Sequence, residues 1–67
     1  MEAGKVGRRI RAFRKLKRVQ QASLAKKIGM SITVLGRIER GEKEPSKELL
    51  HKIADALHIQ IEELIGE

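Results

Sequence analysis

With 67 residues, the chain removes only about 60% of its unfolded surface from water on folding, which leaves too small a core for a deep catalytic pocket. It contains no cysteine, which excludes disulfides and thiolate metal ligands and makes the cytoplasm the expected location. Its net charge is +6, and no run of apolar residues exceeds two, so we expect neither a membrane-spanning segment nor the apolar centre of a signal peptide.

The charge is distributed unevenly along the chain. Residues 1–40 carry a net charge of +10, whereas residues 41–67 carry −4. A basic half joined to an acidic half indicates one side that faces a polyanion and another that faces water or a different partner. Nucleic acid and an anionic membrane are the two candidate polyanions.

The first predicted helix covers residues 5–17. Val6, Ile10 and Phe13 follow each other at the spacing of one helix face, which predicts that this side packs in the core. Basic residues occupy the opposite side, namely Arg8, Arg11, Lys15 and Arg18. They could contact phosphates, lie on an anionic membrane or simply be solvated. Membrane binding is disfavoured because the core needs the apolar side.

Two short helices are expected next, over 21–28 and 32–40. Leu24, Ala25 and Ile28 give the first of them an apolar side, and Gly29 suits the positive φ that follows a helix end. The hydroxyl of Ser31 can cap the helix over 32–40. Its inward residues are Leu35 and Ile38, and Gly41 ends it.

A fourth helix over 47–57 should begin after Pro45, because proline cannot continue a helix and Ser46 can cap one. Its apolar stripe consists of Leu49, Leu50, Ile53, Ala54 and Leu57. A last helix is expected over 61–65, with Gln60 as an imperfect cap. The fold class is therefore all-α, a compact bundle of four or five short helices.

The last helix carries more apolar residues than docking requires. These residues are Ile59, Ile61, Leu64 and Ile65. They could supply a homodimer contact, or all four could close the core.

A helical wheel over 32–40 places Glu39 close to the core. A carboxylate in that position is costly unless it is paired and hydrogen-bonded, and the planar guanidinium of Arg14 suits it. We therefore predict an Arg14–Glu39 ion pair that joins the first helix to the third. The alternative is two solvated surface charges.

The same wheel turns Thr33, Gly36, Arg37 and Arg40 away from the core, with Ile32 and Val34 beside them. Two short helices joined by a turn at Gly29 match the geometry that places a helix in the DNA major groove. There, arginine can donate two hydrogen bonds to guanine, and threonine can contact a thymine methyl. A surface helix with ordinary solvated charges would have the same spacing.

The order and spacing of five motifs resemble the lambda Cro and repressor type of helix-turn-helix domain, the XRE family, over nearly the whole chain. These motifs are "RRIRAFR", "LAKKIGMS", "RIERGEKEPS", "LLHKIADAL" and "IEEL". The resemblance implies one helix-turn-helix domain over 1–67, with five helices in a lambda-repressor-like fold. Its second and third helices would form the reading unit.

The resemblance also implies roles for individual residues. Ile32, Thr33, Gly36 and Arg37 would occupy base-facing positions. Gln21 and the segment Arg40 to Lys43, including Gly41, would contact phosphates. Independently of the resemblance, the basic side of the first helix makes Arg8 and Arg11 further candidates for phosphate contacts. The family often pairs an arginine and a glutamate at the positions of Arg14 and Glu39, in agreement with the wheel.

The chain departs from the family pattern at helix ends and on the reading surface. Gln20 stands where Ser or Thr commonly caps the second helix, and Arg18 and His58 stand where glycine is usual. These departures should weaken local stability more than they threaten the fold. On the reading surface only Thr33 and Arg37 offer polar side chains, so specificity would depend on dimerisation or DNA shape.

Other chemistry is weakly indicated. His51, Asp55 and His58 could be imagined as a metal site, but such spacing is more typical of a solvated face. No catalytic motif and no cofactor motif appear, so enzyme activity is not expected. The leading hypothesis is a sequence-specific transcriptional regulator that binds double-stranded DNA. The rival is a protein-interaction module that binds a protein partner through the apolar surface of Ile32, Val34 and Gly36.

Overall fold

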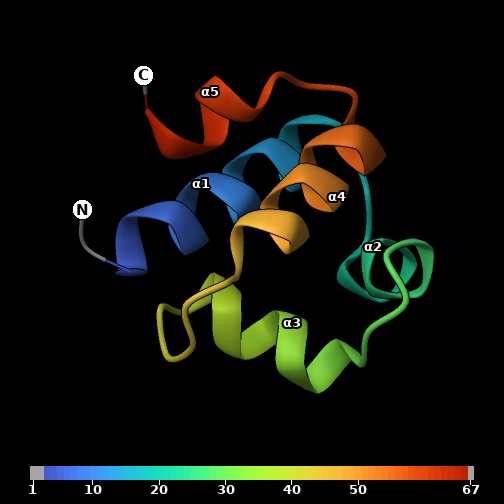
Figure 1. Cartoon of the computed structure of the whole chain (residues 1–67). Coiled ribbons are helices and arrows are strands. Elements are labelled where there is room, and N and C mark those ends of the chain that lie inside the picture. The colour runs from blue at the N-terminus through green and yellow to red at the C-terminus, as the bar shows by residue number, and fades with distance from the viewer. Residues whose placement is uncertain (1–2, 67) are drawn as a thin grey trace.

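The computed structural model describes residues 3–66, which form five helices. The helices are α1 (Ala3–Leu16), α2 (Gln21–Lys27), α3 (Ile32–Glu39), α4 (Lys47–Leu57) and α5 (Ile61–Ile65). In Figure 1, α1 and α4 run through the middle of the molecule, α5 lies across one side of them, and α2 and α3 lie on the other. The expected all-α fold of five short helices is confirmed, although α1 begins two residues earlier than expected.

The core forms where the apolar stripes of all five helices meet. Among its members, Ile10, Leu24, Leu35, Ile53 and Leu64 are fully buried. Phe13 and Leu49 also pack against this cluster, but each remains partly exposed. The side of α1 predicted to face inward does so, because α3, α4 and α5 all contact this helix.

The first four helices end in the same way. A residue in the left-handed conformation follows each one, and these residues are Arg18, Gly29, Gly41 and His58. In each case two backbone hydrogen bonds return to the last turn, as from Val19 N–H to the Arg14 carbonyl (2.9 Å) and from Arg18 N–H to the Lys15 carbonyl (3.0 Å). This is the Schellman arrangement, which satisfies carbonyls that would otherwise lack partners. Arg18 and His58, which stand where glycine is usual, therefore adopt a left-handed backbone conformation that residues with a side chain disfavour.

The helix starts vary more than the ends. Ser31 Oγ accepts a hydrogen bond from Val34 N–H and Ser46 Oγ accepts one from Leu49 N–H, each at 3.1 Å, as expected for serine caps. The side chain of Gln20 makes no such bond at the start of α2. At the start of α5, Gln60 N–H donates instead to the carboxylate of Glu63 at 2.9 Å.

The last helix closes the core with one residue. Leu64 is fully buried, whereas Ile59, Ile61 and Ile65 pack against the core and remain partly exposed. Because α5 contacts both α1 and α4, it covers the junction between these helices. The structure thus accounts for one of the four apolar residues completely and leaves part of the other three facing outward.

Candidate nucleic-acid interface

Helices α2 and α3 form a helix-turn-helix whose turn spans residues 28–31. Gly29 has a φ of 74°, and its successor Met30 donates through its backbone N–H to the Ala25 carbonyl at 2.9 Å. The cap at Ser31 then starts α3 directly. A short turn of this kind fixes the direction of α3 against α2, and the two helices are in contact.

The outward side of α3 presents three of the four residues predicted to face bases. Ile32 is 47% exposed, and Thr33 and Arg37 are also exposed. Leu35 and Ile38, on the opposite side of the helix, are fully buried. The helix therefore shows a surface with one arginine, one threonine and one isoleucine, as the spacing indicates.

Gly36 differs from the prediction, because it is buried rather than outward and open. A Cβ atom at this position would lie 3.1 Å from Arg40 Nη1 and 3.6 Å from Gln21 Nε2. The side chains of Gln21, at the start of α2, and of Arg40, directly after α3, therefore cover the glycine. The wheel gave the direction of Gly36, away from the core, but not the reach of the neighbouring side chains that cover it, so its base-facing role stays a prediction.

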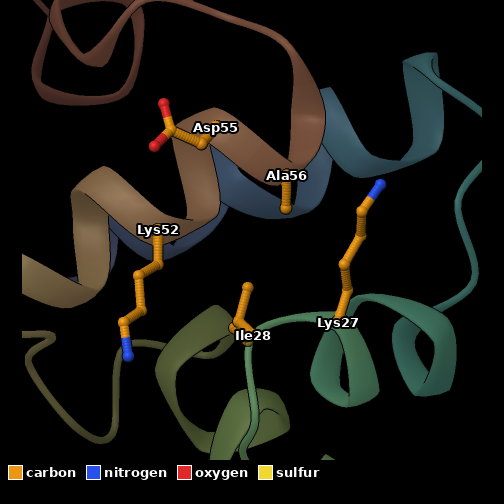
Figure 2. A pocket seen from close by; sticks show the side chains of 5 residues that line it. All are labelled: Lys27, Ile28, Lys52, Asp55 and Ala56. Atoms are coloured by element: carbon orange, nitrogen blue, oxygen red, sulfur yellow. The ribbon is translucent and has the colours of Figure 1, made fainter.

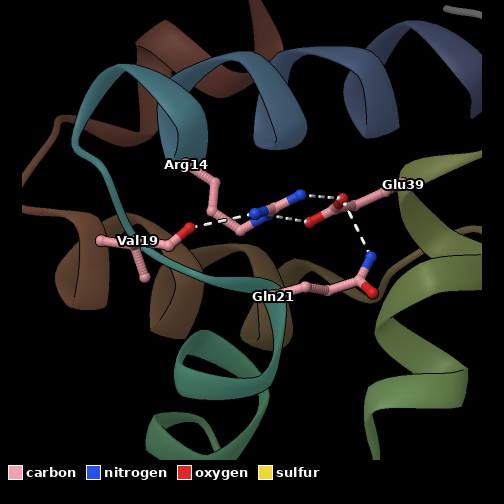
Figure 3. Close-up of polar contacts among 4 residues, drawn as sticks. All are labelled: Arg14, Val19, Gln21 and Glu39. Atoms are coloured by element: carbon pink, nitrogen blue, oxygen red, sulfur yellow. Dashed lines mark hydrogen bonds and ion pairs between the residues drawn. The ribbon is translucent and has the colours of Figure 1, made fainter.

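A hydrogen-bonded network joins α1, α2 and α3 beneath this surface (Figure 3). Arg14 Nε donates to Glu39 Oε2 at 2.8 Å and Arg14 Nη2 donates to Glu39 Oε1 at 3.0 Å. The third guanidinium nitrogen, Nη1, donates to the Val19 carbonyl at 3.0 Å, and Gln21 Nε2 donates to Glu39 Oε1 at 3.2 Å. The predicted Arg14–Glu39 pair is thus present, with exposed fractions of only 8% and 3%.

The network is fully satisfied, since no buried side-chain nitrogen or oxygen within residues 3–66 lacks a hydrogen-bond partner. A bidentate arginine–carboxylate pair has a preferred geometry, so it restricts the approach of α1 and α3 in a way that apolar contact does not. The sequence did not indicate that Gln21 would join the pair. That contact depends on where α2 begins relative to α3.

A cavity of about 220 Å³ opens above the network. Its lining comes from α1, α2, α3 and the residue after α3, and consists of Arg11, Arg14, Gln21, Gly36, Glu39 and Arg40. The lining carries three guanidinium groups and one carboxylate, and one positive charge remains in excess even though Arg40 is also paired with Glu42, which suits an anion. Three of the residues predicted to contact phosphate, Arg11, Gln21 and Arg40, are therefore brought together. Arg8 and Lys43 are exposed but do not line this cavity.

The loop after α3 contains an ion pair that the sequence analysis missed. Arg40 Nε donates to Glu42 Oε2 at 2.7 Å, and Arg37 Nε lies 3.9 Å from Glu42 Oε1. The hydrogen bond from Arg40 lowers the pKa of the Glu42 carboxyl, and the same bond raises the pKa of Arg40. An acid two residues after an arginine, across a glycine turn, is the signal that could have predicted this contact.

Gly41 has a structural role in this loop. Its φ is 80°, and a Cβ atom there would lie 2.6 Å from the Cα atom of Gly4 in α1. Its backbone N–H donates to the Ile38 carbonyl at 3.0 Å, so this donor is already used within the protein, and the phosphate contact expected of Gly41 stays a prediction. Gly41 therefore holds the loop against α1, and the side chains of the neighbouring loop residues are the groups that remain available for a phosphate.

A second cavity, of about 390 Å³, lies between α2 and α4 (Figure 2). Its lining residues are Lys27, Ile28, Lys52, Asp55 and Ala56, and none of the residues predicted to contact DNA is among them. Within residues 3–66, no cluster of three His, Asp or Glu residues could hold a metal ion. Asp55 and His51 of α4 and His58, which follows this helix, are thus not brought together as a ligand set.

The basic side of α1 remains exposed at Arg8 and Arg11, while Val6 and Ile10 are buried in the core. An amphipathic helix that lies on a membrane must insert its apolar side, and here that side is already occupied. None of the helices within residues 3–66 has the length and apolar character needed to cross a bilayer.

Comparison with known proteins agrees with this geometry. The sequence model of the helix-turn-helix family HTH_3 matches residues 10–64. YazB of Bacillus subtilis (strain 168), an HTH-type transcriptional regulator, is 52% identical over 64 residues, which cover 96% of this chain and 93% of YazB.

Two solved structures have the same architecture. The restriction-modification controller protein C.AhdI from Aeromonas hydrophila is 35% identical with a TM-score of 0.88, over 92% of this chain and 94% of that one. The DNA-binding domain of the C2 repressor of Salmonella phage P22 is 37% identical with a TM-score of 0.87, over 97% and 86% of the two chains. The resemblance noted in the sequence is confirmed, and the chain belongs to the HTH_3 (XRE-type) family of helix-turn-helix proteins.

Proposed function

We propose that this chain is a sequence-specific, DNA-binding transcriptional regulator that places α3 in the major groove. The observation that carries the proposal is the exposed surface of Ile32, Thr33 and Arg37 on the second helix of the helix-turn-helix. Arg37 would donate to guanine, and the methyl groups of Thr33 and Ile32 would meet thymine. The reported relatives are regulators and repressors, and they lend no support to the protein-interaction alternative. The proposal places the chain in the cytoplasm and assigns it no catalytic step.

The proposed phosphate contacts surround α3. Arg11, Gln21 and Arg40 line the cavity above the buried network, and Arg8 and Lys43 extend the basic surface on either side of it. Gln21 uses one amide N–H on Glu39, and its second N–H is available for a phosphate oxygen. Contacts of this kind fix the register of a protein on DNA without carrying sequence information.

We infer that two copies bind together through α5. The partly exposed Ile59, Ile61 and Ile65 lie on or beside this helix, and a symmetric contact would bury them. One arginine per copy discriminates one base pair by about 1–3 kcal/mol, so two copies on an inverted repeat would read a longer site. The expected half-sites are about one helical turn apart.

Selection of duplexes from a random DNA library at near-physiological salt tests the proposal. We expect one enriched motif in the form of an inverted repeat. Arg37→Ala should relax the preference at one position of each half-site, whereas Lys43→Ala should weaken binding to all sequences and reduce the salt slope by about 1. Folded protein that enriches no motif, or an unchanged preference in Arg37→Ala, would contradict the assignment of α3 to the major groove.

A further inference from the structure

The carboxylate of Glu42 lies between two arginines of the proposed DNA-binding surface. It accepts from Arg40 Nε at 2.7 Å and from Arg40 Nη2 at 3.5 Å, and Arg37 Nε lies 3.9 Å away. All three side chains are about half exposed, so DNA would approach the group directly. An acid in this place is unexpected, since a negative charge repels phosphate.

The backbone holds Glu42 in this position. Its N–H donates to the Arg37 carbonyl at 2.8 Å, and the N–H of Gly41 donates to the Ile38 carbonyl at 3.0 Å. These two bonds end α3 in the Schellman arrangement, and Gly41 packs against Gly4 of α1. The Glu42 backbone therefore cannot move away from Arg40 unless the end of α3 also changes.

We propose that Glu42 is a positioning residue that competes with DNA phosphate for Arg40, and so lowers the affinity and the salt dependence of DNA binding. This inference rests on the proposed function. In the protein without DNA, the carboxylate of Glu42 occupies the hydrogen-bond donors of Arg40 that a DNA phosphate would otherwise use. The arginine must give up or share its bonds to Glu42 before it can donate to the backbone of DNA.

The charge of the competitor persists over the pH range in which DNA binding is measured. The hydrogen bond from Arg40 lowers the pKa of the Glu42 carboxyl, so the carboxylate stays ionised further into acid than an ordinary glutamate. Glu44, in the same loop, is exposed and makes no hydrogen bond or ion pair with another residue of the 3–66 segment. It differs from Glu42 in its contacts and not in its charge, which makes it a matched control.

The test compares the binding of Glu42→Gln and Glu44→Gln to one DNA duplex of arbitrary sequence, the same in every measurement. Binding is measured by fluorescence anisotropy between about 50 and 200 mM salt. One additional phosphate contact steepens the plot of log K against log salt by about 0.9. We therefore expect the affinity advantage of Glu42→Gln over the wild type to fall by about 3.5-fold across this range. Glu44→Gln should change the slope much less. Circular dichroism checks that each variant is folded.

A double-mutant cycle tests whether the effect of Glu42→Gln on DNA binding acts through Arg40. In the Arg40→Ala background, Glu42→Gln should change binding no more than Glu44→Gln does. Equal steepening by the two glutamate variants would overturn the inference, because it would reduce the effect to total loop charge. An effect of Glu42→Gln that persists without Arg40 would overturn it as well. Folded wild-type protein that binds no duplex would instead contradict the proposed function, and the inference with it.

Discussion

Removal of Arg14 should show how strongly the buried network stabilises the fold. Arg14→Met deletes two hydrogen bonds to Glu39 and one to the Val19 carbonyl. Glu39, which is 3% exposed, would then keep only the amide of Gln21 at 3.2 Å. Breaking a buried pair from one side costs about 3–5 kcal/mol, because it leaves a buried charge without compensation. A chain of 67 residues has a free energy of unfolding of only about 3–10 kcal/mol, so this variant should lose most of its stability.

The control for this prediction removes both charges. Arg14→Met combined with Glu39→Leu leaves no unpaired carboxylate in the core, and such apolar replacements are often neutral or stabilising. We expect the double variant to recover about 2 kcal/mol or more relative to Arg14→Met alone. The loss of the Gln21 contact and imperfect packing will limit the recovery.

Urea denaturation, followed by circular dichroism near 15 °C, measures both effects close to the temperature of greatest stability. With a slope of about 1 kcal/mol per molar urea, Arg14→Met should shift the midpoint down by about 3 M or be unfolded without urea. The double variant should unfold at a higher concentration than the single one. A loss below about 1 kcal/mol in Arg14→Met would show that the pair behaves as a surface pair. Additive losses in the double variant would show that the two residues are not coupled.

Two further substitutions test the helix ends. His58 has a φ of 58°, a left-handed conformation that a side chain disfavours and glycine does not. His58→Gly should therefore stabilise the fold by about 1 kcal/mol and raise the melting temperature of the protein by about 4–8 °C. A fall in melting temperature would contradict the strain assigned to this residue. Gly41→Ala should destabilise by about 1–3 kcal/mol or more, since its Cβ would meet the Gly4 Cα at 2.6 Å with a φ of 80°. Wild-type stability of Gly41→Ala in the same urea assay would show that the close approach to α1 relaxes easily.

Local signals explain why the helices could be predicted from the sequence. Ser31 and Ser46 cap the helices that they precede, and Gly29 and Gly41 follow helix ends with positive φ. Apolar spacing then identified the inward side of each helix. The partner of Glu39 could also be predicted, because a carboxylate so close to the core requires a cation that can reach it.

The features that the sequence did not indicate are contacts that depend on the arrangement of several helices. Gly36 is covered by Gln21 and Arg40, two long side chains whose reach no periodic pattern describes. The pairing of Arg40 with Glu42 depends on the backbone path after α3, which the left-handed Gly41 determines. Local spacing therefore predicted the elements, whereas the details of the charged surface required the structure.

Glu39 connects the stability of the fold to the proposed reading surface. Its carboxylate accepts from Arg14 of α1 and from Gln21 at the start of α2, while its backbone belongs to α3. Apolar contact has no preferred direction, whereas these hydrogen bonds do, so the carboxylate helps to fix the angle between α2 and α3. In the proposed complex, that angle would decide whether Gln21 can meet a phosphate while α3 enters the groove. A variant that breaks the network and still folds should therefore bind DNA less well, even though Arg14 and Glu39 are themselves buried.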